Sequence, residues 1–219
     1  MNQSWSTKTA DSVIARNTPM SHEWHYENGV ILQAIERVWQ KTGDEKYFQF
    51  IKQTLDEFIE PDGNIRTYRL TEFNLDQVNM GKVVLVAWRA TQDERYKRAA
   101  ELLREQMHWQ PRTREGGFWH KLIYPYQMWL DGIYMGTAFL ADFAAAFNER
   151  ATFDEVAFQI SAIEKHTRDA KTGLLYHAWD ESKKQRWANP ITGCAPHFWG
   201  RAIGWYVMAL VDALDHTNR

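Results

Sequence analysis

Residues 39–47 read Trp-Gln-Lys-Thr-Gly-Asp-Glu-Lys-Tyr, and residues 88–96 read Trp-Arg-Ala-Thr-Gln-Asp-Glu-Arg-Tyr. Trp, Thr, Asp, Glu and Tyr recur in register, and a weaker third copy spans residues 143–151, where Asn148 takes the place of the Asp. In each copy the Asp or Asn is placed to cap a following helix, with Glu in that helix's first turn. Apolar residues keep helical spacing on both sides of the first copy, so the repeat predicts a helical hairpin used several times.

Each predicted hairpin also has a glycine in the early part of its first helix. These glycines are Gly29, Gly81 and Gly136. Gly204 opens a fourth such helix over residues 205–214, and the same spacing puts its following turn near residues 211–215. The sequence therefore predicts an all-α fold of three hairpins and one unpaired helix, with seven major helices. We expect residues 1–219 to form a single domain.

The seventh helix is expected to lack an outer partner. If odd-numbered helices form an inner wall and even-numbered helices lie outside them, one face of the seventh stays under-buried. The apolar side chains on that face are Val207, Leu210, Val211 and Leu214. Exposure of this kind costs roughly 25 cal/mol for each Å² of apolar surface left in water. We therefore expect the chain to be weakly stable, oligomeric or inactive by itself.

Two long connections, residues 110–128 and 168–197, are rich in aromatic residues, Gly, His and Pro, and connections of that length are usually functional. Hairpins in series collect the N-terminal ends of the odd-numbered helices on one rim, where the helix dipoles favour an anion. Asp76 and Asp131 stand on that rim, each five residues before its glycine. The two connections deliver His120 and His177 to the same end, so the connectivity predicts a site there.

Composition excludes several classes of protein. The chain has 26 Lys and Arg against 28 Asp and Glu, so it lacks the basic excess of a nucleic-acid-binding protein. Its one cysteine, Cys194, excludes an internal disulfide and fits a reducing compartment. The polar N-terminus lacks the apolar core of a signal peptide, and no apolar run approaches the roughly 20 residues that cross a bilayer. These features predict a soluble, cytoplasmic protein without a membrane partner, and they leave its oligomeric state open.

Two carboxylates without a phosphate loop or a cysteine nucleophile suggest acid/base chemistry on a small molecule, and a carboxylate pair is typical of glycoside hydrolysis. The 11 Trp side chains suit stacking on a sugar, and Arg201 suits a carboxylate. Structural alternatives remain open. Asp76 is also placed as an N-cap, both histidines as hydrogen-bonded aromatics, and Arg201 as the partner of a buried Asp. A metal site is the weakest option, because His22 and His25 have no third ligand at suitable spacing.

Five motifs make the sequence resemble glycoside hydrolase family 105, the unsaturated rhamnogalacturonyl hydrolases. They are Asn-Leu-Asp-Gln-Val-Asn (74–79), Gly-Phe-Trp-His-Lys (117–121), Met-Trp-Leu-Asp-Gly-Ile-Tyr-Met-Gly (128–136), Gly-Leu-Leu-Tyr-His-Ala-Trp-Asp (173–180) and Phe-Trp-Gly-Arg-Ala-Ile-Gly-Trp (198–205). The resemblance implies an (α/α)6 barrel. Such a barrel has about twelve helices, so the chain is expected to form an incomplete one that lacks the C-terminal third.

The resemblance also implies a reaction and a set of residues. Asp131 matches the family's catalytic acid, which protonates C4 of a 4,5-unsaturated uronate before water adds at C5, and Asp76 looks like its catalytic partner. The positions that match substrate-binding residues are Tyr26, His120, His177, Trp199, Arg201 and Trp205. The implied substrate is an unsaturated rhamnogalacturonan oligosaccharide from pectin breakdown, and no cofactor or metal is implied.

Three other functions stay open. The neighbouring unsaturated glucuronyl hydrolases share the barrel and the two aspartates. An ordinary inverting glycosidase uses two carboxylates as an acid and a base. A helical-repeat protein without activity would only associate with another chain.

Overall fold

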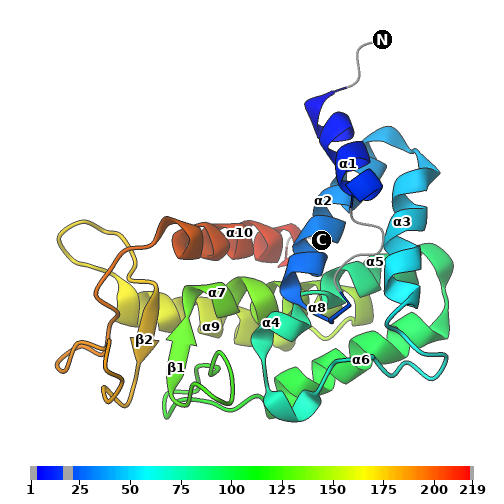
Figure 1. Ribbon diagram of the computed structural model, residues 1–219. Coiled ribbons are helices and arrows are strands. Elements are labelled where there is room, and N and C mark those ends of the chain that lie inside the picture. Colours follow the sequence, from blue (N-terminus) through cyan, green and yellow to red (C-terminus); the bar gives the residue numbers. More distant parts are fainter. Residues whose placement is uncertain (1–3, 17–21, 218–219) are drawn as a thin grey trace. The chain divides into compact units, whose positions relative to one another are not determined.

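The computed structural model describes residues 4–16 and 22–217 (Figure 1). Contacts divide the chain into two compact units. Unit 1 comprises Met1–Tyr68 and Asn79–Leu103, and unit 2 comprises Arg69–Val78 and Arg104–Arg219. Helices dominate both units, so the predicted all-α class is confirmed, whereas the prediction of a single domain stays a prediction.

Unit 1 is built from the first hairpin and the helices that pack on it. Its helices are α1 (Trp5–Arg16), α2 (Tyr26–Thr42), α3 (Glu45–Asp56), α5 (Gly81–Thr91) and the first part of α6 (Glu94–Trp109). Helix α2 packs against α3, α5 and α1. Fully buried Leu32, Ile51 and Leu55 form part of the core between these helices. The helical spacing of apolar residues on both sides of the first repeat is thus the pattern that closes the hairpin.

The turns of the first two repeats have the predicted caps. The Asp44 carboxylate accepts a hydrogen bond from the Lys46 N–H at 3.1 Å at the start of α3. Asp93 accepts one from the Arg95 N–H at 3.0 Å at the start of α6. In the residue before each cap the backbone is left-handed, with φ of 67° at Gly43 and 55° at Gln92. The repeated sequence therefore ends one helix and starts the next within two residues.

The third repeat differs from the prediction, because Asn148 does not cap the start of the following helix. Its φ of 57° ends α8, so it occupies the left-handed place of the residue that precedes the cap in the other two turns. The next helix, α9 (Thr152–Thr167), begins only at Thr152 and has no side-chain cap. The Thr152 hydroxyl instead donates to the Glu149 carboxylate at 3.1 Å. The third copy is thus shifted by one residue and its turn is longer.

Unit 2 contains the other helices and one small sheet. After η1 (Leu70–Glu72) and α4 (Leu75–Val78) come the second part of α6, β1 (Gln127–Trp129), α7 (Leu130–Gly132), the π-helix η2 (Ile133–Thr137), α8 (Ala138–Phe147), α9, β2 (Ala178–Asp180) and α10 (Gly200–Thr217). Helix α8 packs against both α9 and α10 (Figure 1). Helix α10 continues to Thr217, so the turn predicted near residues 211–215 is wrong.

The stretch Leu130–Phe147 is the core of unit 2. It is long and apolar enough to cross a membrane by length and composition, but 83% of it is buried inside the structure. The expectation that no apolar run approaches the length that crosses a bilayer is therefore wrong, since this run has 18 residues with only two charged positions, Asp131 and Asp142.

The two long connections meet in an antiparallel pair of strands. Met128 of β1 pairs with Trp179 of β2, and Trp129 pairs with Ala178. The Leu130 N–H then donates to the carbonyl oxygen of His177 at 3.0 Å. This pairing was not predicted, because each strand has only three residues. It places His177 beside the beginning of α7, where Asp131 lies.

One face of α10 exposes apolar side chains, as the helix count predicts. Val207, Val211 and Leu214 are about half exposed, at 50%, 55% and 57%, whereas Leu210 is partly buried. The three exposed residues follow helical spacing and therefore form one stripe. An exposed stripe of this kind favours self-association.

We expect Val211→Glu to reduce self-association of the chain at high concentration, because it places a charge in the middle of the stripe. Since Val211 is exposed, the substitution should change the free energy of unfolding of the chain by no more than the ~0.5 kcal/mol typical of surface substitutions. Sedimentation velocity over a range of concentrations measures the effect. Ala145→Glu, at an exposed position of α8, is the matched control. Equal association of the Val211→Glu and unmodified chains would show that the stripe is not the contact surface.

Candidate active site

Asp131 lies where strand β1 gives way to helix α7. It is 7% exposed, and its Oδ2 atom is buried without a hydrogen-bond partner among the described residues. The π-helix η2 begins two residues later. Such widened turns are rare and occur frequently at functional sites. A buried carboxyl group with an unused oxygen, next to an irregular helix, is suited to exchange a proton with a ligand.

The surroundings of Asp131 favour its neutral form. Burial raises the pKa of its carboxyl group above the ordinary value, and the negative charge of Asp76 adds to the rise. A backbone hydrogen bond and the charges of Arg201 and His177 act in the opposite direction on that pKa. Because burial dominates, Asp131 holds its proton to a higher pH than an exposed aspartate. This is the property that a general acid needs near neutral pH.

Asp76 is buried in the short helix α4, where its carboxylate meets one ammonium group and one imidazole ring. Its Oδ2 atom lies 2.6 Å from the Lys121 ammonium, and its Oδ1 atom lies 3.4 Å from Nε2 of His120. Asp76 is not an N-cap, because the cap is Asn74, whose side chain accepts the Asp76 N–H at 3.0 Å. The alternative that Asp76 is the N-cap of this helix is therefore wrong. Its carboxylate belongs to a charged cluster with Lys121 and His120.

His120 is buried, and it is held by the backbone on both sides. The backbone N–H of His120 donates to the Gln127 carbonyl at 2.8 Å, and the backbone carbonyl of His120 accepts the Leu75 N–H at 3.1 Å. Its ring stacks on Trp129 with centroids 4.8 Å apart and planes 10° apart. Burial lowers the pKa of His120 to about 4, so the imidazole is neutral near pH 7. The Nδ1 atom has no hydrogen-bond partner within the described part of the chain, and a role of His120 in the site stays a prediction.

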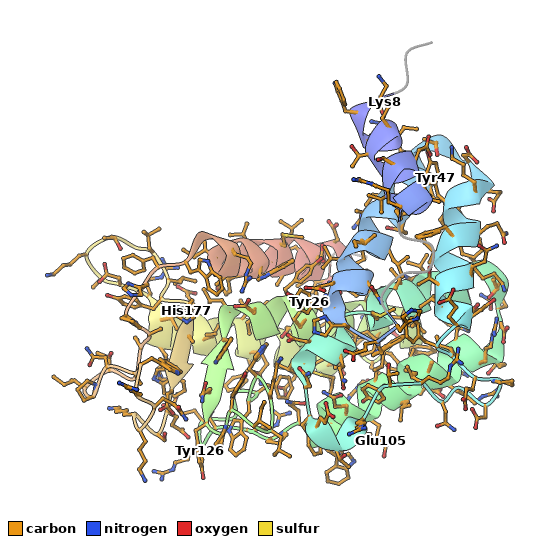
Figure 2. All side chains as sticks on the ribbon, in the orientation of Figure 1. Lys8, Tyr26, Tyr47, Glu105, Tyr126 and His177 are labelled. Carbon is orange, nitrogen blue, oxygen red and sulfur yellow. The ribbon has the colours of Figure 1, made fainter. Side chains whose placement is uncertain are left out.

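His177 and the start of α10 supply an aromatic wall and a cation. His177 lies beside β2 in Figure 2, and its ring centroid is 6.3 Å from that of Trp129 and 5.8 Å from that of Trp199. The Arg201 guanidinium lies over Trp199 at 3.8 Å from its centroid. Arg201 forms no ion pair with a carboxylate of the described residues, although its positive charge acts to lower the pKa of Asp131. Its guanidinium is therefore available to an anionic ligand.

Trp205 is also in unit 2, where it stacks on Tyr134 of η2 with centroids 4.8 Å apart. Seven of the eight predicted site residues thus lie in one unit: Asp76, Asp131, His120, His177, Trp199, Arg201 and Trp205. Tyr26 begins α2 in unit 1, and its place in the site stays a prediction. Sequence reasoning gave no role to Lys121 and Tyr134. Lys121 directly follows His120 in the Gly-Phe-Trp-His-Lys motif (117–121), but a lysine next to a histidine does not by itself identify an aspartate as its partner.

Comparison with known proteins identifies the family of this arrangement. The model of Glycosyl Hydrolase Family 88 matches residues 1–218. The chain belongs to glycosyl hydrolase family 88. A solved structure of a glycoside hydrolase from family 105 of C. acetobutylicum ATCC 824 is 48% identical, with a TM-score of 0.95 over 98% of this chain and 59% of that chain. The predicted resemblance to family 105 and the (α/α)6-barrel fold class are thereby confirmed.

Two more relatives of this family 88 chain differ in what they support. The unsaturated rhamnogalacturonyl hydrolase YesR of Bacillus subtilis (strain 168) is 28% identical over 214 residues, which are 95% of this chain and 58% of YesR. A possible member of family 105 from Klebsiella pneumoniae subsp. pneumoniae MGH 78578 is 23% identical with a TM-score of 0.77, over 90% of this chain and 49% of its own, and it supports the fold alone. The chain spans less than two thirds of the length of these relatives.

Gly132 leaves room for the His120 ring in the candidate site. A Cβ atom added at Gly132 would lie 2.9 Å from Nδ1 of His120 and 3.0 Å from a methyl group of Leu75. We expect Gly132→Ala to displace the imidazole from Asp76, to lower kcat/KM about tenfold and to destabilise the fold by ~1–3 kcal/mol, as overpacking does. Kinetics on an unsaturated uronide and thermal unfolding measure the two effects.

Gly204→Ala is the matched control for this substitution, because a Cβ atom at Gly204 would meet nothing within 4 Å. Since alanine favours the helix interior, Gly204→Ala should leave stability unchanged or raise it by up to ~1 kcal/mol. If Gly132→Ala keeps full kcat/KM, the position of His120 is not important for the reaction.

Proposed function

We propose that this protein is an unsaturated rhamnogalacturonyl hydrolase, which removes a 4,5-unsaturated galacturonyl residue from rhamnose. The observation that carries the proposal is the buried Asp131, whose pKa is raised and whose surroundings include the positive charge of Arg201. An acid next to a cation matches a substrate that must be protonated and that carries a carboxylate. The similarity to YesR, whose name states this activity, supports the same substrate class.

In the proposed reaction Asp131 donates its proton to C4 of the unsaturated ring. The positive charge that develops at C5 is shared with the ring oxygen, and water adds at C5 to give a hemiketal. The hemiketal opens and expels the rhamnose as an alcohol, so the overall reaction consumes one water. The Asp131 carboxylate, formed in the first step, takes a proton from the attacking water. General acid catalysis of this type typically contributes ~10²–10⁴-fold.

The other side chains position the substrate in this proposal. The Arg201 guanidinium binds the substrate carboxylate through two parallel hydrogen bonds, which lysine cannot form. Asp76 accepts hydrogen bonds from sugar hydroxyls and water, while the Lys121 ammonium at 2.6 Å orients its carboxylate. Trp199 and Trp205 provide aromatic faces for the sugar ring. Neutral His120 accepts or donates a hydrogen bond without adding a second positive charge beside Lys121.

The test compares an unsaturated with a saturated galacturonyl-rhamnose disaccharide. We expect turnover of the unsaturated disaccharide, seen as loss of the ultraviolet absorbance of its conjugated double bond, and none of the saturated one. Equal cleavage of the two substrates would replace the proposal with an inverting glycosidase that uses Asp76 and Asp131 as base and acid. A preference for an unsaturated glucuronide would move the protein to the unsaturated glucuronyl hydrolases. If the protein acts on none of these three substrates, the alternative of a helical-repeat protein without this activity would replace the proposal.

A further inference from the structure

A hollow in unit 2 lies between the end of α9 and the segment that follows β2. Its volume is about 520 Å³, within the range of ~300–1,000 Å³ typical of small-molecule sites. Asp76, Asp131 and Arg201 do not line it. The side chains that characterise the hollow are His166, Arg168, Asp169, Tyr176, Trp187 and Asn189.

The segment that carries Trp187 and Asn189 has a fixed conformation. Asp180, at the end of β2, is fully buried, and its carboxylate accepts the backbone N–H groups of Ser182, Lys184 and Gln185, each at 2.9 Å. Farther along, Gly193 has a φ of 82° and lies so close to the Asp180 carbonyl that a Cβ atom would be 2.4 Å from it. Main-chain hydrogen bonds thus hold the wall of the hollow before any ligand binds, which reduces the entropy cost of binding.

The lining combines aromatic faces with polar groups of nearly balanced charge. Tyr176 and Trp187 present rings, and the Asn189 side-chain oxygen accepts the Ile191 and Thr192 N–H groups at 2.8 and 3.0 Å, which leaves its NH₂ group for a ligand. Arg168 and Asp169 contribute opposite charges. A multiply charged anion is therefore disfavoured, whereas a neutral sugar ring offers both an apolar face for the aromatic rings and hydroxyls for the polar groups.

Trp187 also connects the hollow with the candidate active site. Its ring centroid lies 6.3 Å from that of His177, whose ring in turn contacts Trp129 and Trp199. We propose that this hollow binds the neutral sugar on the leaving side of the scissile bond, with Trp187 as its stacking surface. The inference rests on the proposed function, because that function supplies a neutral rhamnose next to the uronate.

The experiment compares two substrates that differ only in the leaving group: unsaturated galacturonyl-rhamnose and the methyl glycoside of the same unsaturated uronate. Trp187→Ala should lower the ratio of their kcat/KM values, rhamnose over methyl, about tenfold, because only the rhamnose reaches the hollow. Tyr176→Phe should lower the same ratio about threefold by removing one hydroxyl group. Trp109→Ala, at an exposed position in unit 2, is the control and should not change the ratio. An unchanged ratio in Trp187→Ala would overturn the inference.

A binding measurement separates this inference from the proposed function. L-Rhamnose is added to the unmodified chain and to Trp187→Ala, and magnetisation transfer from protein to sugar is recorded by NMR. Transfer that is present in the unmodified chain and lost in Trp187→Ala supports the sugar site even if neither glycoside is hydrolysed, in which case only the proposed reaction fails. Equal transfer in both proteins, or none in either, would show that Trp187 holds no rhamnose. Thermal unfolding of each variant confirms that it remains folded.

Discussion

Asp131→Asn should lower kcat on unsaturated galacturonyl-rhamnose by ~10²–10⁴-fold while the chain stays folded, because asparagine keeps the shape of the side chain and has no acidic proton. Activity of the unmodified chain requires the protonated carboxyl group, so it should fall as pH rises through the pKa of Asp131. Burial raises that pKa, and the fall should therefore occur at a higher pH than an exposed aspartate would give. Steady-state kinetics over a range of pH measures both effects.

Asp142→Asn provides the control for Asp131→Asn. Asp142 is also a buried aspartate in the same continuous helical stretch, but it lies 3.6 Å from His216 near the end of α10 and not with the site residues. Loss of a buried carboxylate at Asp142 should affect stability more than turnover. Near-normal kcat of Asp131→Asn, with folding confirmed by circular dichroism, would remove Asp131 from the chemical step.

Arg201→Lys should raise KM about 10- to 100-fold, since hydrogen bonds to charged groups contribute ~1.5–3 kcal/mol and lysine cannot form the bidentate pair. A smaller decrease of kcat is expected if the lost bond also orients the ring. Arg112→Lys is the control, because Arg112 pairs with Glu155 at 2.8 Å and lies over Phe118, outside the site. If Arg201→Lys binds the substrate as well as the unmodified chain does, the bidentate role is wrong.

Much of the fold follows from repeated local signals. Asp44 and Asp93 each follow a left-handed residue and accept a backbone N–H two residues later, and this cap is what makes the repeat visible in the sequence. The third turn was placed one residue out because Asn148 suits both a cap and a left-handed position, and only the structure distinguishes the two. Strands β1 and β2 were not predicted, because three residues are too few to show the alternation of apolar and polar residues that marks a strand.

The two aspartates of the candidate site could be predicted from the sequence, whereas the contacts around them could not. Spacing from Gly81 and Gly136 identified Asp76 and Asp131, because the two helix starts are equivalent in the repeat. The contact between Asp76 and Lys121 depends on how the connection after α6 folds back, and no local pattern encodes that path. Gly132 likewise has no sequence signal for its role, which is to leave room for His120 from a distant segment.

The central claim is that Asp131 protonates C4 of an unsaturated uronate, and isotope incorporation tests it most directly. The disaccharide is converted in heavy water, and the product is examined by NMR immediately after a short reaction. Product incubated in heavy water without the protein corrects for exchange at C4, which lies next to the new C5 carbonyl. We predict one deuterium at C4 for each rhamnose released, with both deuterium incorporation and rhamnose release lost in Asp131→Asn. Release of rhamnose with the double bond intact and no deuterium at C4 would contradict the claim.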